Sequence, residues 1–143
     1  MQSIVKFFQD TWDASPGYLF LAGFIILIGI VGKARLFAKA GFPFLAAFVP
    51  VWDIVVTLRM VGRPSMHLAY LLVPGYNIYF LFKLLIEVAQ SYGKYTVLDY
   101  VLVCLFNVFY VLNLGLAYNE FYYGPVYGMD FKDVQARKEP VFA

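Results

Sequence analysis

Four stretches of about twenty residues that are almost free of charge constrain this chain more than any other feature. They run over residues 14–32, 40–58, 64–82 and 100–119. The second contains a single charged residue, Asp53, and the third a single titratable histidine, His67. A helix that rises about 1.5 Å per residue needs about 20 apolar residues to cross the hydrocarbon of a bilayer. The pattern predicts an all-α integral membrane protein with about four hydrophobic segments.

The composition of the chain supports this prediction. Of its 143 residues, 62% are hydrophobic and 14% are charged, whereas soluble domains have about 45–50% and 25%. The net charge of +2 without a basic run predicts no nucleic-acid partner. The single cysteine, Cys104, excludes an internal disulfide and a multi-cysteine metal site. We therefore expect the lipid bilayer as a partner, and no cofactor.

We expect three parts along the chain. Residues 1–15 have the spacing of an amphipathic helix at the membrane interface, and their two aspartates against one lysine do not fit a signal peptide. Residues 16–119 form the membrane domain, which Pro16 begins as a first helical residue. Residues 120–143 are a tyrosine-rich interfacial stretch followed by a polar tail.

Two of the hydrophobic segments are interrupted in the same way. "VPVWDI" begins at Val49 and "VPGYNI" begins at Val73. A shift of 24 residues places one on the other, so that proline, aromatic and Asx residues coincide: Pro50 with Pro74, Trp52 with Tyr76, and Asp53 with Asn77. We interpret the pair as an internal repeat of a Pro-x-aromatic-Asx break, although chance matching of valine and isoleucine competes with this interpretation.

The physical chemistry of such a break is well defined. Proline lacks a backbone donor and disfavours helix in the residue before it, while Asp or Asn three residues later can cap the next helix. A break that faces lipid leaves backbone groups unsatisfied. We therefore expect Asp53 and Asn77 to act as caps, and the breaks to face protein or lie near the membrane–water boundary.

Two topologies fit the sequence. If all four segments cross, the cationic residues divide five to six between the two sides, which gives no orientation. If the second and third segments are re-entrant hairpins, seven cations lie on one side and four on the other. The length of the segment that begins at Tyr76 favours four kinked crossing segments, with hairpins as the alternative.

Ionisable residues near the breaks form a candidate polar cluster. Its members are Asp53, Arg59, Lys83 and Glu87, together with Asn77. The spacing of Lys83 and Glu87 predicts an ion pair along one helix face. The cluster suits a proton, ion or lipid-headgroup site; alternatively, Asp53 caps a half-helix while the cations extend to the interface. The equivalence of Asp53 with Asn77 favours the second interpretation, because either residue can cap.

No catalytic constellation is apparent. The Ser65-Met66 pair matches the nucleophile region of signal peptidases, but no partner lysine follows it in a basic dipeptide. His67 has no ligand-type residues near it in sequence, so we predict no metal site. We expect a protein that is not an enzyme.

Five short motifs occur in order along the chain: "KAGFP", "AAFVPVWD", "VGRP", "VPGYNIY" and "SYGK". Over residues 33–123 the chain resembles a group of small bacterial membrane proteins of unassigned function. A similar module is fused ahead of the catalytic domain in some signal peptidase I proteins. Trp52-Asp53 replaces the Tyr-Asn usual in the group.

The resemblance implies a multi-pass protein of the bacterial inner membrane. We predict a non-catalytic subunit of a larger membrane complex, and the fused relatives imply protein export or signal-peptide processing. The alternative is a small transporter or channel that uses the Pro-Asx breaks as an ion or lipid site. A quinone-linked respiratory subunit is a third candidate, without haem or cluster ligands to favour it.

Overall fold

A computed structural model describes residues 1–14 and 16–141. The described residues form seven α-helices and two 3-10 helices, with no strand among them. Their bounds are α1 Gln2–Ala14, α2 Pro16–Lys39, η1 Phe44–Phe48, α3 Pro50–Val61, η2 Ser65–Leu72, α4 Tyr76–Ser91, α5 Val97–Leu105, α6 Asn107–Leu116 and α7 Phe131–Gln135. The all-α prediction is confirmed. Residue 15, at the predicted boundary of the first two parts, and residues 142–143 of the predicted tail lie outside the described residues.

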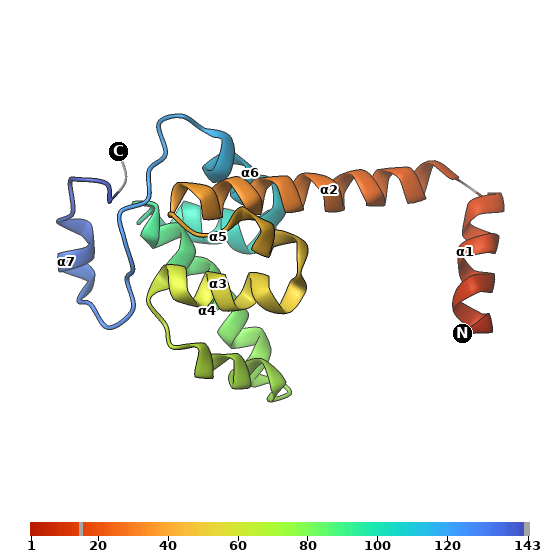
Figure 1. Ribbon diagram of the computed structural model, residues 1–143, viewed down its shortest axis with the longest axis horizontal. Helices are drawn as coiled ribbons and strands as arrows, with labels where there is room; N and C mark the ends of the chain where they lie inside the picture. Colours follow the sequence, from red (N-terminus) through yellow and green to blue (C-terminus); the bar gives the residue numbers. More distant parts are fainter. Residues whose placement is uncertain (15, 142–143) are drawn as a thin grey trace.

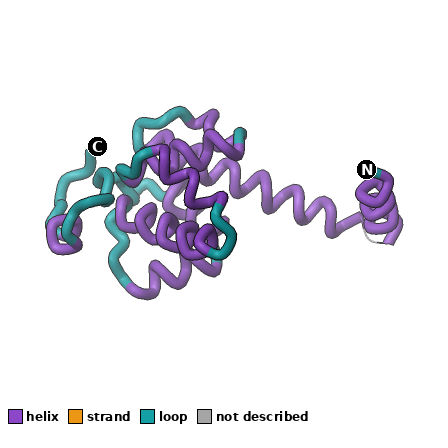
Figure 2. Tube along the Cα trace, turned by 90° about the horizontal axis from the view of Figure 1, so that it is seen from below, coloured by secondary structure: helices purple, strands orange, loops and turns teal. Residues whose placement is uncertain are grey.

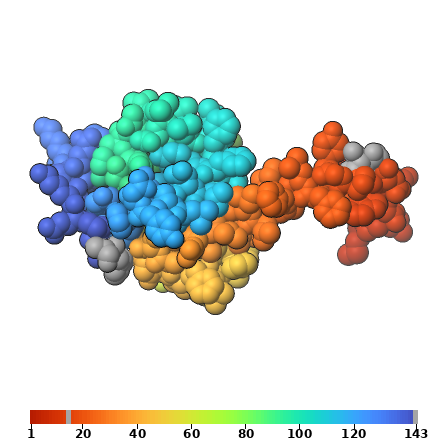
Figure 3. All heavy atoms as spheres, turned by 90° about the horizontal axis from the view of Figure 1, so that it is seen from above, coloured from red at the N-terminus to blue at the C-terminus, as the bar shows by residue number. Residues whose placement is uncertain are grey.

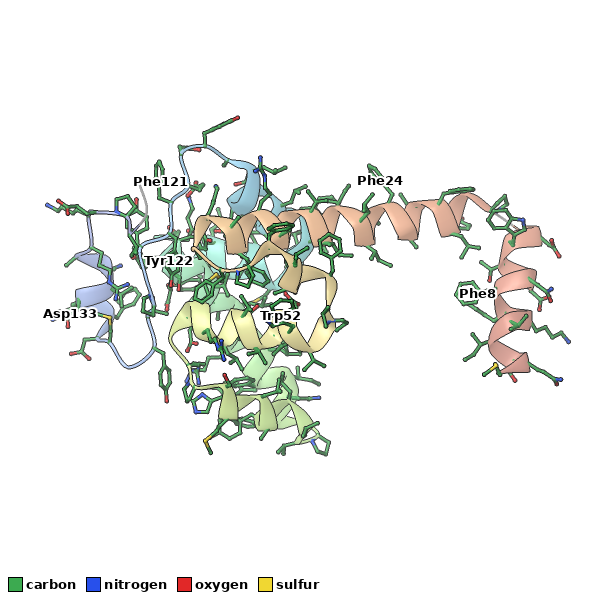
Figure 4. All side chains as sticks on the ribbon, viewed as in Figure 1. Phe8, Phe24, Trp52, Phe121, Tyr122 and Asp133 are labelled. Atoms are coloured by element: carbon green, nitrogen blue, oxygen red, sulfur yellow. The ribbon has the colours of Figure 1, made fainter. Side chains whose placement is uncertain are left out.

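The longest helix, α2, joins two very different environments. Its second half packs on η1 and α6, whereas its first half projects from the body of the molecule and meets α1, which lies across its end (Figures 1 and 2). In space-filling view the projecting half stands clear of the body (Figure 3). Its apolar side chains are exposed, including Phe20 at 69%, and Phe24 points away from the helix (Figure 4). We call residues 16–28 the free half of α2.

One described helix, α2, is long and apolar enough to cross a membrane. The number rises to two only if α5 and α6, which are bent by 114° at their junction, are taken as one span. Only 11% of the most apolar window of α2 is buried, whereas the core helix of a soluble protein is mostly buried. Four continuous spans are therefore not what the structure shows.

Both predicted breaks are confirmed, and their backbones repeat. A proline precedes each 3-10 helix with a φ of −65°, Pro43 for η1 and Pro64 for η2. Each 3-10 helix then ends at an extended valine with a ψ of 111°, Val49 or Val73. A second proline follows each valine. The interruption thus converts a 3-10 helix into an α-helix twice, as the 24-residue shift indicates.

At each break the chain turns back on itself. η1 leads away from the end of α2 and α3 returns along it; η2 and α4 repeat this path (Figure 1). The fourth predicted segment, residues 100–119, turns as well, between α5 and α6 at Phe106. We call residues 41–62, 62–93 and 97–117 hairpins 1, 2 and 3. The hairpin alternative fits the described chain better than four kinked crossings.

The outer ends of the hairpins meet at one face, which we call the capping face. The Tyr92 hydroxyl donates to the Leu36 carbonyl at the end of α2, and the Tyr122 hydroxyl donates to the Met60 carbonyl near the end of α3. The amide of Tyr123 donates to the Ser91 carbonyl at the end of α4 (2.8 Å). The Lys39 ammonium donates to carbonyls at the end of α6 and just beyond it. Helix ends leave carbonyls without partners, and here Lys39, Tyr92 and the segment after α6 donate hydrogen bonds to several of them.

The inner ends of the hairpins, which we call the tips, are apolar and exposed. Tip 1 comprises residues 48–52, tip 2 residues 72–76 and tip 3 residues 105–107. Phe48 is 57% exposed, Leu72 84% and Phe106 56%. An exposed apolar surface of this kind is typical of contact with lipid or with another protein.

Candidate functional site

Asp53, the acidic residue of the first break, forms an ion pair with Lys33 of α2. The Lys33 Nζ and the Asp53 Oδ2 are 2.6 Å apart, and their side chains are 38% and 13% exposed. The other carboxylate oxygen, Oδ1, is buried without a hydrogen-bond partner among the described residues. Half of the carboxylate is therefore unsatisfied.

Local sequence places Asp53 there. Because Pro50 is the first residue of α3, Asp53 falls in the first helical turn, where its charge is favourable next to the positive end of the helix dipole. The amide of Asp53 donates to the Val49 carbonyl (2.8 Å), as the amide of Asn77 does to the Val73 carbonyl (3.0 Å). Neither α3 nor α4 has a side-chain cap. The predicted capping role of Asp53 and Asn77 is therefore wrong, because both lie inside the helices.

Two hollows adjoin the ion pair. The first, of about 210 Å³, lies between α2, α3, α4 and α6, and the second, of about 340 Å³, lies between α2, tip 1 and the start of α6. Lys33, Asp53 and Asn107 line both hollows. Asn107 is the first residue of α6, so the break of hairpin 3 brings it there. We call Lys33, Asp53 and Asn107 the polar triad.

The other break residues lie on the tips. Pro50 begins α3, while Pro74 lies in a turn before α4. Trp52 is 40% exposed. Tyr76 begins α4 and packs against Tyr70 with ring centroids 5.4 Å apart. Asn77 is half-buried and, unlike Asp53, lines neither hollow of the triad.

The predicted cluster of Asp53, Arg59, Lys83 and Glu87 is not assembled. Asp53 pairs with Lys33, and Glu87 pairs with Arg63 rather than with Lys83. Arg59 and Lys83 are exposed and form no ion pair with any described residue. Sequence spacing along one helix missed these pairs, because both partners come from other elements.

Arg63 and Glu87 form a buried, two-pronged ion pair. The Arg63 Nε and Nη2 each donate to one Glu87 carboxylate oxygen at 2.6 Å. The guanidinium carbon also lies 4.5 Å from the ring centroid of Tyr127 and 5.3 Å from that of Phe80. The hydrogen bonds that the Arg63 guanidinium donates to Glu87 raise its pKa above the ordinary value. Each carboxylate oxygen of Glu87 accepts a hydrogen bond from Arg63, so the pair ties the start of hairpin 2 to α4.

At the capping face, polar side chains form hydrogen bonds with backbone carbonyls or pair with one another. Burial raises the pKa of Tyr122 to about 12, so its hydroxyl stays protonated as the donor to Met60. Lys94 pairs with Glu120 at 2.6 Å. These contacts hold the segment after α6 in place and leave the polar triad as the candidate site.

The described chain combines an all-helical body of three hairpins with one helix of membrane-spanning length, α2, and these two features define the class of protein. The chain matches the Family of unknown function (DUF5684) over residues 45–125, and it belongs to that family. No curated protein and no solved structure matches it. The match covers most of the region of the predicted resemblance, so an unknown-function family is confirmed; the bacterial origin and the link to signal peptidases stay predictions. Lys33 precedes the matched residues.

Proposed function

We propose that the protein is a non-catalytic membrane protein that docks on a larger membrane assembly. In this proposal α2 crosses the bilayer and the three hairpins enter one leaflet without crossing it. The observation that carries the proposal is the apolar surface formed by the free half of α2 and by tips 1 and 3, which no described residue covers.

Helix lengths support this arrangement. The 24 residues of α2 span about 36 Å, whereas a hydrocarbon core is about 30 Å thick. The 12 residues of α3 and the 16 of α4 span about 18 and 24 Å, too short to cross. The second hollow joins Ile25 and Ile26 of α2 to Phe48 and Pro50 of tip 1. Tip 1, and tip 3 through Asn107 in the same hollow, therefore reach roughly the middle of the layer that α2 spans.

The charges also divide in favour of one crossing. Ten of the eleven lysines and arginines follow the apolar part of α2, and Lys6 alone precedes it. With a single crossing, all ten lie on one side or within the hairpins. The positive-inside rule then places the capping face in the cytoplasm and the N-terminus outside.

We therefore expect the two ends of the chain to lie on opposite sides of the membrane. Single cysteines at Ser3 and Lys138, in a Cys104→Ala background, are to be labelled with an impermeant thiol reagent in intact cells and after lysis. Ser3→Cys reacts in intact cells, and Lys138→Cys reacts only after lysis. Ala38→Cys serves as the internal control and follows Lys138→Cys. Four crossings require instead that Ser3→Cys and Lys138→Cys share one side, opposite to Ala38→Cys.

Docking is supported by the tips themselves. α3 and α4 begin at tips 1 and 2 without side-chain caps, and first-turn amides need acceptors from outside the helix. Hydrocarbon offers none. A partner protein that covers the tips supplies acceptors and buries the exposed apolar side chains. The ion pairs of the body serve its internal packing, which fits a non-catalytic subunit. The association with bacterial protein export depends on the resemblance alone.

Site-directed photo-crosslinking tests docking. A photoreactive phenylalanine analogue is placed at Phe24, Phe48 or Phe106, with Tyr118, which is 97% exposed beyond α6, as the matched aromatic control. We expect discrete protein adducts from the first three positions and none from Tyr118, followed by identification of the partner by mass spectrometry after mild-detergent purification. Adducts with lipid alone at all three positions contradict docking.

The alternative of a small transporter has one observation in its favour, the unsatisfied Oδ1 of Asp53 beside two hollows. Lys33 neutralises that carboxylate, so the site does not favour a free cation. Ion flux in liposomes that depends on Asp53 would favour the transporter over the docking subunit.

A further inference from the structure

We infer that the polar triad lines a water-accessible hollow within the membrane layer, whose ligand is a neutral hydrogen-bond donor: water or the hydroxyl group of a small molecule. This inference rests on the membrane placement in the proposed function. It assigns to Lys33, Asp53 and Asn107 a role beyond the packing of the body.

The first argument is the unsatisfied carboxylate oxygen. Asp53 is 9% exposed, and its Oδ1 has no donor among the described residues, while Asp53 itself lines both hollows. A buried polar atom without a hydrogen bond is costly. Acyl chains carry no donor, so an occupant that satisfies Oδ1 is polar. Hollows of about 210 and 340 Å³ exceed the roughly 30 Å³ that a water molecule takes up in the liquid.

The second argument concerns charge. Lys33 and Asp53 lie in contact at 2.6 Å, so the pair is neutral as a whole. A cation is repelled by the Lys33 ammonium and an anion by the Asp53 carboxylate. The ligand is therefore a neutral group. It donates a hydrogen bond to Oδ1 of Asp53 and accepts one from the Lys33 ammonium, which has three N–H donors.

The third argument is that other polar side chains also line the hollows. The side-chain amide group of Asn107 lines both hollows, and this side chain forms no hydrogen bond with another described residue. The Thr57 hydroxyl lines the first hollow, but it already donates to the Asp53 carbonyl at 2.8 Å. Irregular backbone within a membrane occurs where protein buries it or where it lines a water-filled cavity. The break at Asn107 meets the second condition if the hollow is hydrated.

Water-soluble thiol reagents test the inference in membrane vesicles that expose the capping face. In the Cys104→Ala background, Leu81→Cys lines the first hollow and Val108→Cys the second. Phe82→Cys and Phe109→Cys are the matched controls: each is the next residue on the same helix, one step nearer the capping face, and lines neither hollow. Leu81 and Phe82 are equally exposed, at 44% and 45%. Depth and exposure therefore do not favour the test positions.

We expect the cysteines at 81 and 108 to react at least about tenfold faster than those at 82 and 109, because thiols react as thiolates, which form in water rather than in lipid. If none of the four cysteines reacts, the hydrated hollow is overturned and the membrane placement is unaffected. Equal reaction at all four, together with reaction of Phe24→Cys on the free half of α2, overturns the membrane placement itself.

Reagent charge provides the second measurement. At position 108 we expect cationic and anionic reagents to react with the ratio seen for a free thiol. Asp53→Asn leaves Lys33 unopposed and raises the relative rate of the anionic reagent by about threefold or more; Lys33→Gln has the opposite effect. The double variant restores the original ratio, which shows that the single variants act through charge. Ratios that no variant changes contradict the assignment of the triad to the hollow.

Discussion

Glu87→Gln is expected to lower the free energy of unfolding by about 3–5 kcal/mol, because it leaves Arg63 as a buried charge without its carboxylate. The side chains of the pair are 6% and 11% exposed, so water does not compensate the loss. Thermal and denaturant unfolding in detergent, followed by circular dichroism, measures the change. Hairpin 2 is expected to open first at its capping-face end, because this pair joins the start of the hairpin to α4.

Lys83→Gln is the matched control on the same helix. Lys83 is exposed and pairs with no described residue, so its replacement is expected to change stability by less than about 0.5 kcal/mol. The double variant Arg63→Met/Glu87→Leu is expected to recover most of the loss, since a buried pair replaced by apolar groups is often neutral. A Glu87→Gln protein as stable as the Lys83→Gln protein would show that the ion pair contributes nothing.

Gly115→Leu is expected to detach α6 from α2. A Cβ atom at Gly115 would lie 2.5 Å from the Gly32 carbonyl oxygen, and one at Gly32 would lie 2.8 Å from the Leu112 Cα. Both contacts are with backbone, which cannot move aside as a side chain can. Overpacking costs about 1–3 kcal/mol where side chains give way, so we expect a loss of at least about 3 kcal/mol. Unfolding in detergent and crosslinking between cysteines on the two helices measure the effect.

Gly23→Ala is the comparison on the free half of α2: it also replaces a glycine, but with a smaller side chain than in Gly115→Leu. A Cβ atom there has no atom within 4 Å, so helix propensity is the remaining effect, and it favours alanine by up to about 1 kcal/mol. Gly23→Ala is therefore expected to leave the contact of α2 with α6 intact. If Gly115→Leu behaves like Gly23→Ala, the close approach of the two helices is not needed for the fold.

The repeated break and the hairpins now have one explanation. In each of the first two hairpins a Gly-x-Pro turn at the capping face leads into a 3-10 helix, and a Val-Pro step at the tip leads into the returning α-helix. At the second of these turns Gly62 has a φ of 88°, and a Cβ atom there would lie 2.7 Å from Pro125. Glycine is required on both grounds. The two Val-Pro motifs that the sequence presents as interruptions of crossing helices are therefore the tips of hairpins 1 and 2.

The Val-Pro breaks and the long apolar helix α2 were predictable because each depends only on residues that are close together in sequence. Proline fixes φ and lacks an amide hydrogen wherever it stands, so both Val-Pro breaks were predicted correctly. The length and apolar character of α2 follow from its own residues in the same way. The third break was missed, because Phe106 is followed by no proline and its bend depends on the packing of α6 against α2.

The sequence by itself therefore determined an all-helical chain, its two proline breaks and a helix long enough to cross a membrane, because each depends on local backbone sterics or on hydropathy. The tertiary structure alone decided which charges meet. Lys33 and Asp53 are 20 residues apart and Arg63 and Glu87 are 24 apart, and only the reversal of the chain at each tip brings them within hydrogen-bond distance. A charge interacts with whatever the fold places beside it, and linear spacing does not contain that information.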